Sequence, residues 1–100
     1  MQTIINRKDK KVEITVSGRI DTIASPEFEQ SLSGLMNEDE LDVMMDCSAM
    51  DYISSSGLRV FLTLLKALKA HGGSLTLISM QEGIREIFDM TGFSKLFIIK

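Results

Sequence analysis

The sequence contains few of the residues on which covalent cross-links, metal sites and acid–base catalysis depend. Its 100 residues include one cysteine, Cys47, and one histidine, His71. A single cysteine excludes an internal disulfide framework and is typical of a small core residue in a reducing compartment. Because the cysteine and the histidine are isolated from each other and from other ligands, they form no metal-binding cluster, and we expect no metal site.

Two further absences concern membranes and nucleic acids. No apolar run approaches the roughly 20 residues that span a bilayer, and Arg7 and Lys8 follow a short apolar stretch, the reverse of the order in a secretory signal. We therefore expect a cytoplasmic protein without membrane insertion. The net charge of −3 argues against nucleic acid as a direct partner, since binding to the phosphate backbone relies on an excess of Lys and Arg.

The remaining composition is that of an ordinary globular domain. Hydrophobic residues make up 44% and charged residues 25% of the chain, which is sufficient for a core without cross-links. A chain of 100 residues has the common size of one domain. It contains no internal repeat, low-complexity tract or linker, so we expect a single domain over residues 1–100.

In the first half of the chain, the hydrophobic pattern predicts a hairpin, a helix and a central strand. Residues 12–16 alternate between apolar and polar, as in a strand with one buried face, and residues 3–5 are a shorter candidate to pair with it. Ser25 is expected to cap a helix that has Pro26 in its first position. Residues 41–47 are mostly apolar, which indicates a strand covered on both faces.

In the second half, helices and strands continue to alternate. A helix over about residues 56–70 is expected to bury the stripe Leu58, Phe61, Leu62, Leu65 and Leu68. A strand at 74–79, a helix at 81–90 and a strand at 96–99 follow. The resulting order, β-β-α-β-α-β-α-β, predicts an α/β fold with a mixed or largely parallel sheet covered by helices. Right-handed crossovers place the strand-to-helix connections along one edge of that sheet.

The most distinctive stretch is Asp51–Arg59, in which Ser54, Ser55, Ser56 and Gly57 precede the long helix. We expect a loop at the carboxyl end of the central strand, where open α/β sheets usually have their sites. The free N–H groups of a helix start can hold a phosphate, which suggests a switch. A purely structural alternative is that these serines only supply the N-cap of the helix.

The serines do not indicate catalysis. A serine nucleophile needs a base, and His71 follows the far end of the helix that starts near Ser56, about 20 Å away at ~1.5 Å per residue. The G-x-S-x-G elbow of hydrolases is absent, as are the phosphate-binding motifs G-x-x-x-x-G-K-[ST] and G-x-G-x-x-G. We expect neither an enzyme nor a cofactor, although a small-ligand or nucleotide-binding domain using the same helix start stays open.

Four short motifs follow one another along the chain: Gly18–Asp21 (G-x-[IL]-D), Asp46–Ser48 (Asp-hydrophobic-Ser), Ser54–Leu58 and Thr91–Phe93 (T-G-[LF]). In this order and spacing they resemble the STAS domains of anti-sigma factor antagonists, and the resemblance covers nearly the whole chain. The third motif is similar to the family's signature loop D-S-[ST]-G-L, with Ser54 in place of the aspartate. Arg59, directly after it, stands where a small residue is common in the family.

This resemblance implies a binding module controlled by phosphorylation. The family's phosphorylated serine corresponds to Ser55. The unmodified protein would sequester an anti-sigma factor that is also a serine kinase and thereby regulate transcription, and a serine phosphatase would reverse the phosphorylation. Further residues expected at the partner surface are Asp21, Ser54, Ser56, Gly57 and Arg59. The alternative within the same family is a STAS subunit of a lipid-transport or sensor complex.

Overall fold

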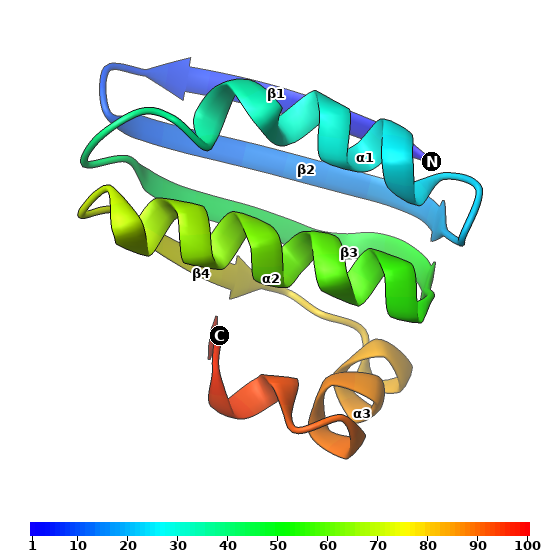
Figure 1. The fold of residues 1–100 in the computed structure, drawn as a ribbon. Helices are drawn as coiled ribbons and strands as arrows, with labels where there is room; N and C mark the ends of the chain where they lie inside the picture. Colours follow the sequence, from blue (N-terminus) through cyan, green and yellow to red (C-terminus); the bar gives the residue numbers. More distant parts are fainter.

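A five-stranded sheet with β3 at its centre forms the framework of the protein (Figure 1). A computed structural model describes residues 1–100. The strands are β1 (Gln2–Lys8), β2 (Lys11–Ile20), β3 (Asp42–Ile53), β4 (Ser74–Ile78) and β5 (Ile98–Ile99). The first two strands form an antiparallel hairpin, and all other neighbours are parallel. The predicted mixed sheet and hairpin are therefore confirmed.

Three helices connect the parallel strands. They are α1 (Ser25–Leu32), extended by a 3₁₀ turn η1 (Ser33–Leu35), α2 (Ser55–Ala70), and α3 (Glu82–Met90), which a second 3₁₀ turn η2 (Phe93–Lys95) follows. The predicted order of elements is confirmed. Because the strands lie in the sheet in chain order, right-handed crossovers put the connecting helices on the same face, and Figure 1 shows α1 and α2 side by side there. None of the helices has the length and apolar run that a bilayer span requires.

The hydrophobic core lies between this face of the sheet and the helices. It contains 24 buried residues, with a group of phenylalanines at its centre. The ring of Phe61 on α2 lies 5.5 Å from that of Phe28 on α1 and 5.7 Å from that of Phe88 on α3. All three helices are thus joined through one aromatic side chain, with edge-to-face and tilted contacts that such rings favour.

The prediction that β3 is covered on both faces is wrong. Buried and exposed residues alternate along its first half, with Val43 and Met45 fully buried and Met44 43% exposed. The physical reason is the one-sided placement of the helices, which leaves the opposite face of the sheet bare. Composition alone could not show this, because methionine is apolar enough to suggest burial on either face.

Local boundaries also differ from the predictions. The expected serine-rich loop is absent, because β3 continues to Ile53, which pairs with Ile20 of β2, and Ser54 alone joins it to the helix. The last strand is shorter than residues 96–99, because the preceding η2 turn extends to a hydrogen bond from Leu96 N to Phe93 O. On α2, Leu62 is only partly buried, while Val60 and Leu64 join the core.

Gly57 allows α2 to lie directly against the ends of two strands. A Cβ atom at this position would be 2.8 Å from Ile20 Cγ2 and 2.9 Å from Ile53 Cγ1, which is closer than any normal contact. Ile20 and Ile53 are themselves buried, so neither can turn away into solvent. Gly57 therefore sets the distance between the helix start and the sheet.

Gly57→Ala is expected to destabilise the protein by about 1–3 kcal/mol, the usual cost of inserting an extra methyl group into a packed core. Gly83→Ala is the matched control, since no atom lies within 4 Å of the added Cβ and alanine is favoured over glycine in a helix by about 1 kcal/mol. Urea denaturation of both variants measures the difference. Equal stability of Gly57→Ala and the wild type would show that α2 can move away from the strands.

Candidate functional site

The serines lie where the ends of β2 and β3 meet the start of α2. The backbone N–H of Ser54 donates a hydrogen bond to Ile20 O at 2.8 Å, so the junction between β3 and α2 is fixed to the end of β2. Asp21 follows Ile20 directly in the chain. The structure therefore brings Asp21 and the serines to the same edge of the sheet, as the topology predicts.

The three serines differ in exposure and in bonding. Ser54 is 8% exposed, has an extended backbone, and its Oγ accepts a hydrogen bond from Gly57 N at 3.1 Å. It is the N-cap of α2, so the structural role considered from the sequence is present, but it belongs to Ser54 alone. Ser56 is half-buried. Ser55 is the exposed member, in the first position of the helix, and its hydroxyl forms no hydrogen bond within the protein.

The electrostatic environment of Ser55 suits negative charge. The N-terminus of a helix carries about half a positive elementary charge, and the first turn of α2 contains no acidic residue. Arg59 is one turn further along, at the (i, i+4) spacing that brings side chains together on one face of a helix. Arg59 is exposed and takes part in none of the ion pairs of the structure.

A polar groove of about 360 Å³ runs between the starts of α1 and α2. Its lining residues are Thr22, Ser25, Pro26, Glu29, Ser56, Arg59 and Val60. The groove combines hydroxyl groups with one cation and one carboxylate, and it is open to solvent. It is suited to contact with another protein surface and is too polar for an apolar small molecule.

Asp21 turns the chain from β2 into α1. Its Oδ1 accepts a hydrogen bond from Ala24 N at 2.8 Å, and its carbonyl oxygen accepts from the Ser25 hydroxyl at 2.7 Å. The prediction that Ser25 caps α1 is wrong, because Ala24 is the N-cap residue and Ser25 lies buried in the first turn. Asp21 thus has the structural role of holding the loop that borders the groove.

Two features of this edge are not apparent in the sequence. The guanidinium of Arg19 lies over the ring of Tyr52, 4.4 Å from its centroid, a distance typical of a cation–π contact. The pairing depends on an irregular register in which Arg19 faces Tyr52 only after two shifts between β2 and β3. Ile23, in the loop held by Asp21, is 89% exposed. The sequence analysis missed Ile23, and the only signal available there was a large apolar residue between a strand and a helix.

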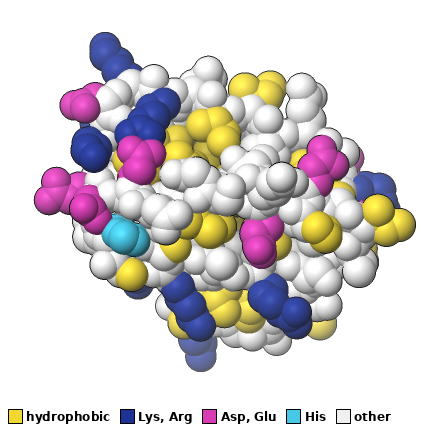
Figure 2. Space-filling view, turned by 45° about the horizontal axis from the view of Figure 1, so that its top comes forward, with side chains coloured by type: hydrophobic (Ala, Val, Ile, Leu, Met, Phe, Trp, Pro, Cys, Tyr) yellow, Lys and Arg dark blue, Asp and Glu magenta, His cyan; other side chains and the backbone are white.

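His71 lies at the opposite end of α2 from Ser55. The helix has 16 residues, so the two ends are about 24 Å apart. His71 Nδ1 is 2.7 Å from Asp39 Oδ1, and Figure 2 shows the histidine beside acidic side chains. The histidine is thus bound into a surface cluster and is too distant to act on the serine hydroxyl.

These observations define an α/β binding domain whose exposed serine starts a helix at the carboxyl edge of the sheet. A family model for the STAS domain matches residues 3–100, and the chain belongs to this family.

An anti-sigma-B factor antagonist from Staphylococcus epidermidis is 33% identical over 88 residues, which cover 88% of this chain and 82% of the relative. The same fold occurs in solved structures. A crystal structure of an anti-sigma factor antagonist from Mycobacterium paratuberculosis superposes with a TM-score of 0.85 at 23% identity, covering 98% of this chain and 83% of that protein. The Bacillus cell fate determinant SpoIIAA in its phosphorylated form gives a TM-score of 0.73 at 16% identity, covering 99% and 91%.

Ser54→Ala is expected to destabilise the protein by about 0.5–2 kcal/mol, because the N-cap hydrogen bond to Gly57 is lost. Ser55→Ala, the control in the adjacent position, removes no hydrogen bond and should change stability by less than about 0.5 kcal/mol. Chemical denaturation distinguishes the two. The capping assignment is incorrect if Ser55→Ala proves the more harmful substitution.

Proposed function

We propose that the protein is an anti-sigma factor antagonist that acts by binding and is switched off by phosphorylation of Ser55. The observation that carries the proposal is the difference among the three serines: Ser55 alone combines an exposed hydroxyl with a place in the first turn of α2. The names of the relatives support the same function, since the Staphylococcus epidermidis protein is an anti-sigma-B factor antagonist. As a regulator of transcription it would act in the cytoplasm.

The proposed partner is an anti-sigma factor with serine kinase activity. The kinase transfers the γ-phosphoryl group of ATP to Ser55 Oγ: a new P–O bond forms, the bond between the β- and γ-phosphates breaks, and the kinase removes the hydroxyl proton. A serine phosphatase later hydrolyses the ester with water and restores the hydroxyl. The existence of SpoIIAA in a phosphorylated form supports such a cycle in this fold.

The charge change explains how phosphorylation separates the two proteins. Phosphoserine adds about −1.5 to −2 charges at pH 7. Within this protein that charge lies beside the free N–H groups of α2 and near Arg59, where it is tolerated. A partner surface complementary to the small neutral hydroxyl of Ser55 is not complementary to a dianion. A loss of about 3 kcal/mol at the interface weakens binding more than a hundredfold.

The surrounding residues divide into two groups in this mechanism. Asp21, Ser56 and Arg59 are accessible at the groove or its border and are proposed to contact the partner. Ser54 and Gly57 are buried, so they contribute by fixing the position of the helix start. The exposed Ile23 side chain is close enough in sequence to Asp21 to contact the same partner.

The first prediction concerns the site and its effect on affinity. After incubation with the kinase-type anti-sigma factor of the same organism and ATP, fragmentation mass spectrometry should place one phosphate on Ser55. Calorimetric titration should show Ser55→Ala binding that partner within about threefold of the wild type. Ser55→Asp should bind modestly more weakly because it carries only one charge, and the phosphorylated protein should bind more than about a hundredfold more weakly.

Phosphate on Ser54 or Ser56 alone would contradict the assignment of the site. Equal affinity of the unmodified and phosphorylated forms would contradict the switch while leaving the site intact. If the anti-sigma factor binds no form of the protein, the alternative of a STAS subunit in a lipid-transport or sensor complex gains support.

A separate prediction concerns Arg59 as the internal partner of the phosphate. The second pKa of a free phosphoserine is near 6, and a nearby guanidinium favours the dianion and lowers it. Arg59→Ala in the phosphorylated protein should therefore raise this pKa, by about 0.3–0.7 units for an exposed pair worth up to ~1 kcal/mol. Phosphorus NMR titration measures it. Lys66→Ala is the control, since Lys66 is also exposed on α2 but lies two turns further along; the same shift in both variants would exclude a specific role for Arg59.

A further inference from the structure

The face of the sheet opposite the helices is a second surface that the proposed function does not use. Strands β2 to β5 are parallel, and parallel sheets nearly always have both faces covered. Here the bare face carries Met44 and Ile98, which are 43% and 53% exposed, and Ile4, which is 47% exposed. Met44 and Ile98 lie on either side of β4, whose half-buried Ile78 projects from the same face. Ile4 on β1 is separated from them by Thr15 and Asp46.

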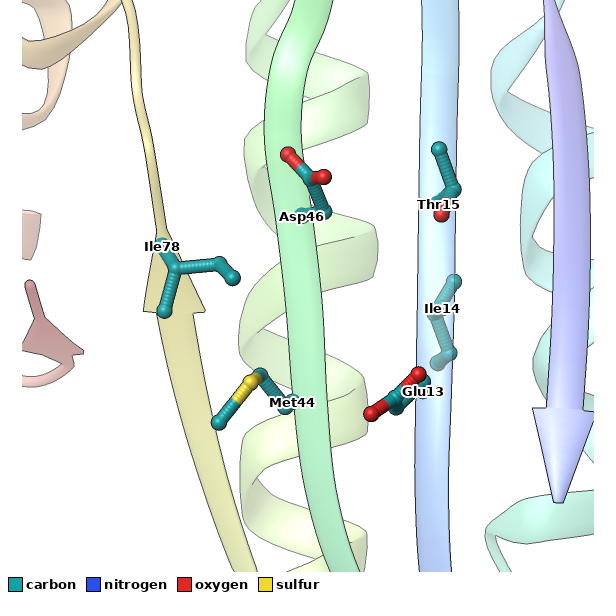
Figure 3. A pocket seen from close by; sticks show the side chains of 6 residues that line it. All are labelled: Glu13, Ile14, Thr15, Met44, Asp46 and Ile78. Carbon is teal, nitrogen blue, oxygen red and sulfur yellow. The ribbon is translucent and has the colours of Figure 1, made fainter.

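A cavity of about 150 Å³ lies on this face (Figure 3). It is lined by Glu13, Ile14, Thr15, Met44, Asp46 and Ile78. The register places Glu13 beside Met44, and Asp46 between Thr15 and Ile78. Figure 3 shows the side chains of Glu13, Met44, Asp46 and Ile78 projecting on the side of the sheet away from α2, with Glu13 directed toward β3.

The ionisable groups of the cavity have the same sign. Glu13 forms no hydrogen bond or ion pair with another side chain, and Asp46 uses one carboxylate oxygen, Oδ1, to accept a hydrogen bond from Ser48 N at 2.9 Å. Lys8 and Lys11 also lie on this face, and they line a separate cavity together with Glu13 on its β1 side. Neither lysine forms an ion pair with Glu13. Within the cavity itself Glu13 and Asp46 are the only ionisable residues, and Lys8 and Lys11 lie on the other side of Glu13.

We propose that this face binds a basic amphipathic segment of a partner protein, with a lysine or arginine side chain inserted between Glu13 and Asp46. The aliphatic part of such a side chain packs on Met44 and Ile78 while its cationic end reaches the carboxylates. The apolar residues of the segment cover Ile98 and Ile4.

This surface lies on the other side of the sheet from the groove between α1 and α2, so both can be occupied at once. The proposal does not depend on phosphorylation of Ser55. A partner bound here would connect the protein to a second component without competing for the serine site.

The test uses the intact ¹⁵N-labelled protein and two synthetic peptides of about 14 residues, or about 21 Å of helix. One contains leucine and lysine in a helical pattern, and the other contains glutamate in place of each lysine. The basic peptide should shift the amide signals of residues on the bare face, including Glu13, Thr15 and Asp46, in a saturable manner, and added salt should weaken its binding. The acidic peptide should have no effect.

The combination of Glu13→Gln and Asp46→Asn should weaken binding of the basic peptide by about fivefold for each lost charge. Both substitutions preserve side-chain size, and the amide oxygen introduced by Asp46→Asn can still accept the hydrogen bond from Ser48 N. Glu86→Gln on the exposed surface of α3 is the control and should leave the affinity unchanged.

Three results would overturn the proposal. The first is equal binding of the two peptides, or an absence of shifts on the bare face at saturating peptide. The second is an equal change in affinity for the basic peptide in the Glu13→Gln, Asp46→Asn double variant and in the Glu86→Gln control. The third is a dimer in sedimentation experiments together with concentration-dependent shifts of the same residues without peptide, which would assign the face to a second copy of the chain.

Discussion

The close contact between the start of α2 and the ends of β2 and β3 is the constraint on which the rest of the structure depends. Gly57 permits it, because any side chain at this position would collide with Ile20 and Ile53. The hydrogen bond from Ser54 N to Ile20 O fixes it. Once the helix start is held in this way, Ser54 can only point into the fold as a cap, and Ser55 can only be exposed. The arrangement of the serines at this edge is thus a direct result of packing.

The order of the strands determines where the two surfaces of the protein lie. Each crossover moves one strand further in the same direction, so all helices cover one face and the sheet is open on the other. The helix-covered side presents the polar groove and Ser55 at one edge. The open side presents apolar residues with carboxylates and lysines among them, a combination that differs in chemistry from the groove.

Much of the fold could be predicted from the sequence, because the period of the hydrophobic residues changes clearly between strands and helices. The order of elements, the hairpin, the limits of α2 and the position of the serines at the carboxyl edge of β3 were all predicted. The pattern could not reveal that β3 has one bare face, since that depends on crossovers and not on the composition of residues 41–47. It also missed the strand character of Asp51–Ile53, which comes from pairing with the irregular end of β2.

The candidate site was predicted less completely than the fold. The residues Asp21, Ser54, Ser55, Ser56, Gly57 and Arg59 do gather at one edge. Their individual structural roles were not apparent, because exposure and hydrogen bonding are decided by a few ångströms of packing. The turn that Asp21 stabilises before α1, with Ala24 and not Ser25 as the N-cap, depends on the local backbone conformation. The contact between Arg19 and Tyr52 depends on register shifts that no local pattern specifies.

The different environments of the three serines have a consequence for how a modifying enzyme selects its target. In a flexible serine-rich loop, neighbouring hydroxyl groups are chemically equivalent, and the enzyme must distinguish them by reading the flanking residues. Here the fold itself makes the three serines different. Ser54 is buried as the N-cap, Ser56 is half-buried in the groove, and only Ser55 is exposed. Under the proposed function, the kinase selects Ser55 because the fold of its substrate exposes that serine alone. Unfolding the substrate would therefore remove the selectivity among the three serines.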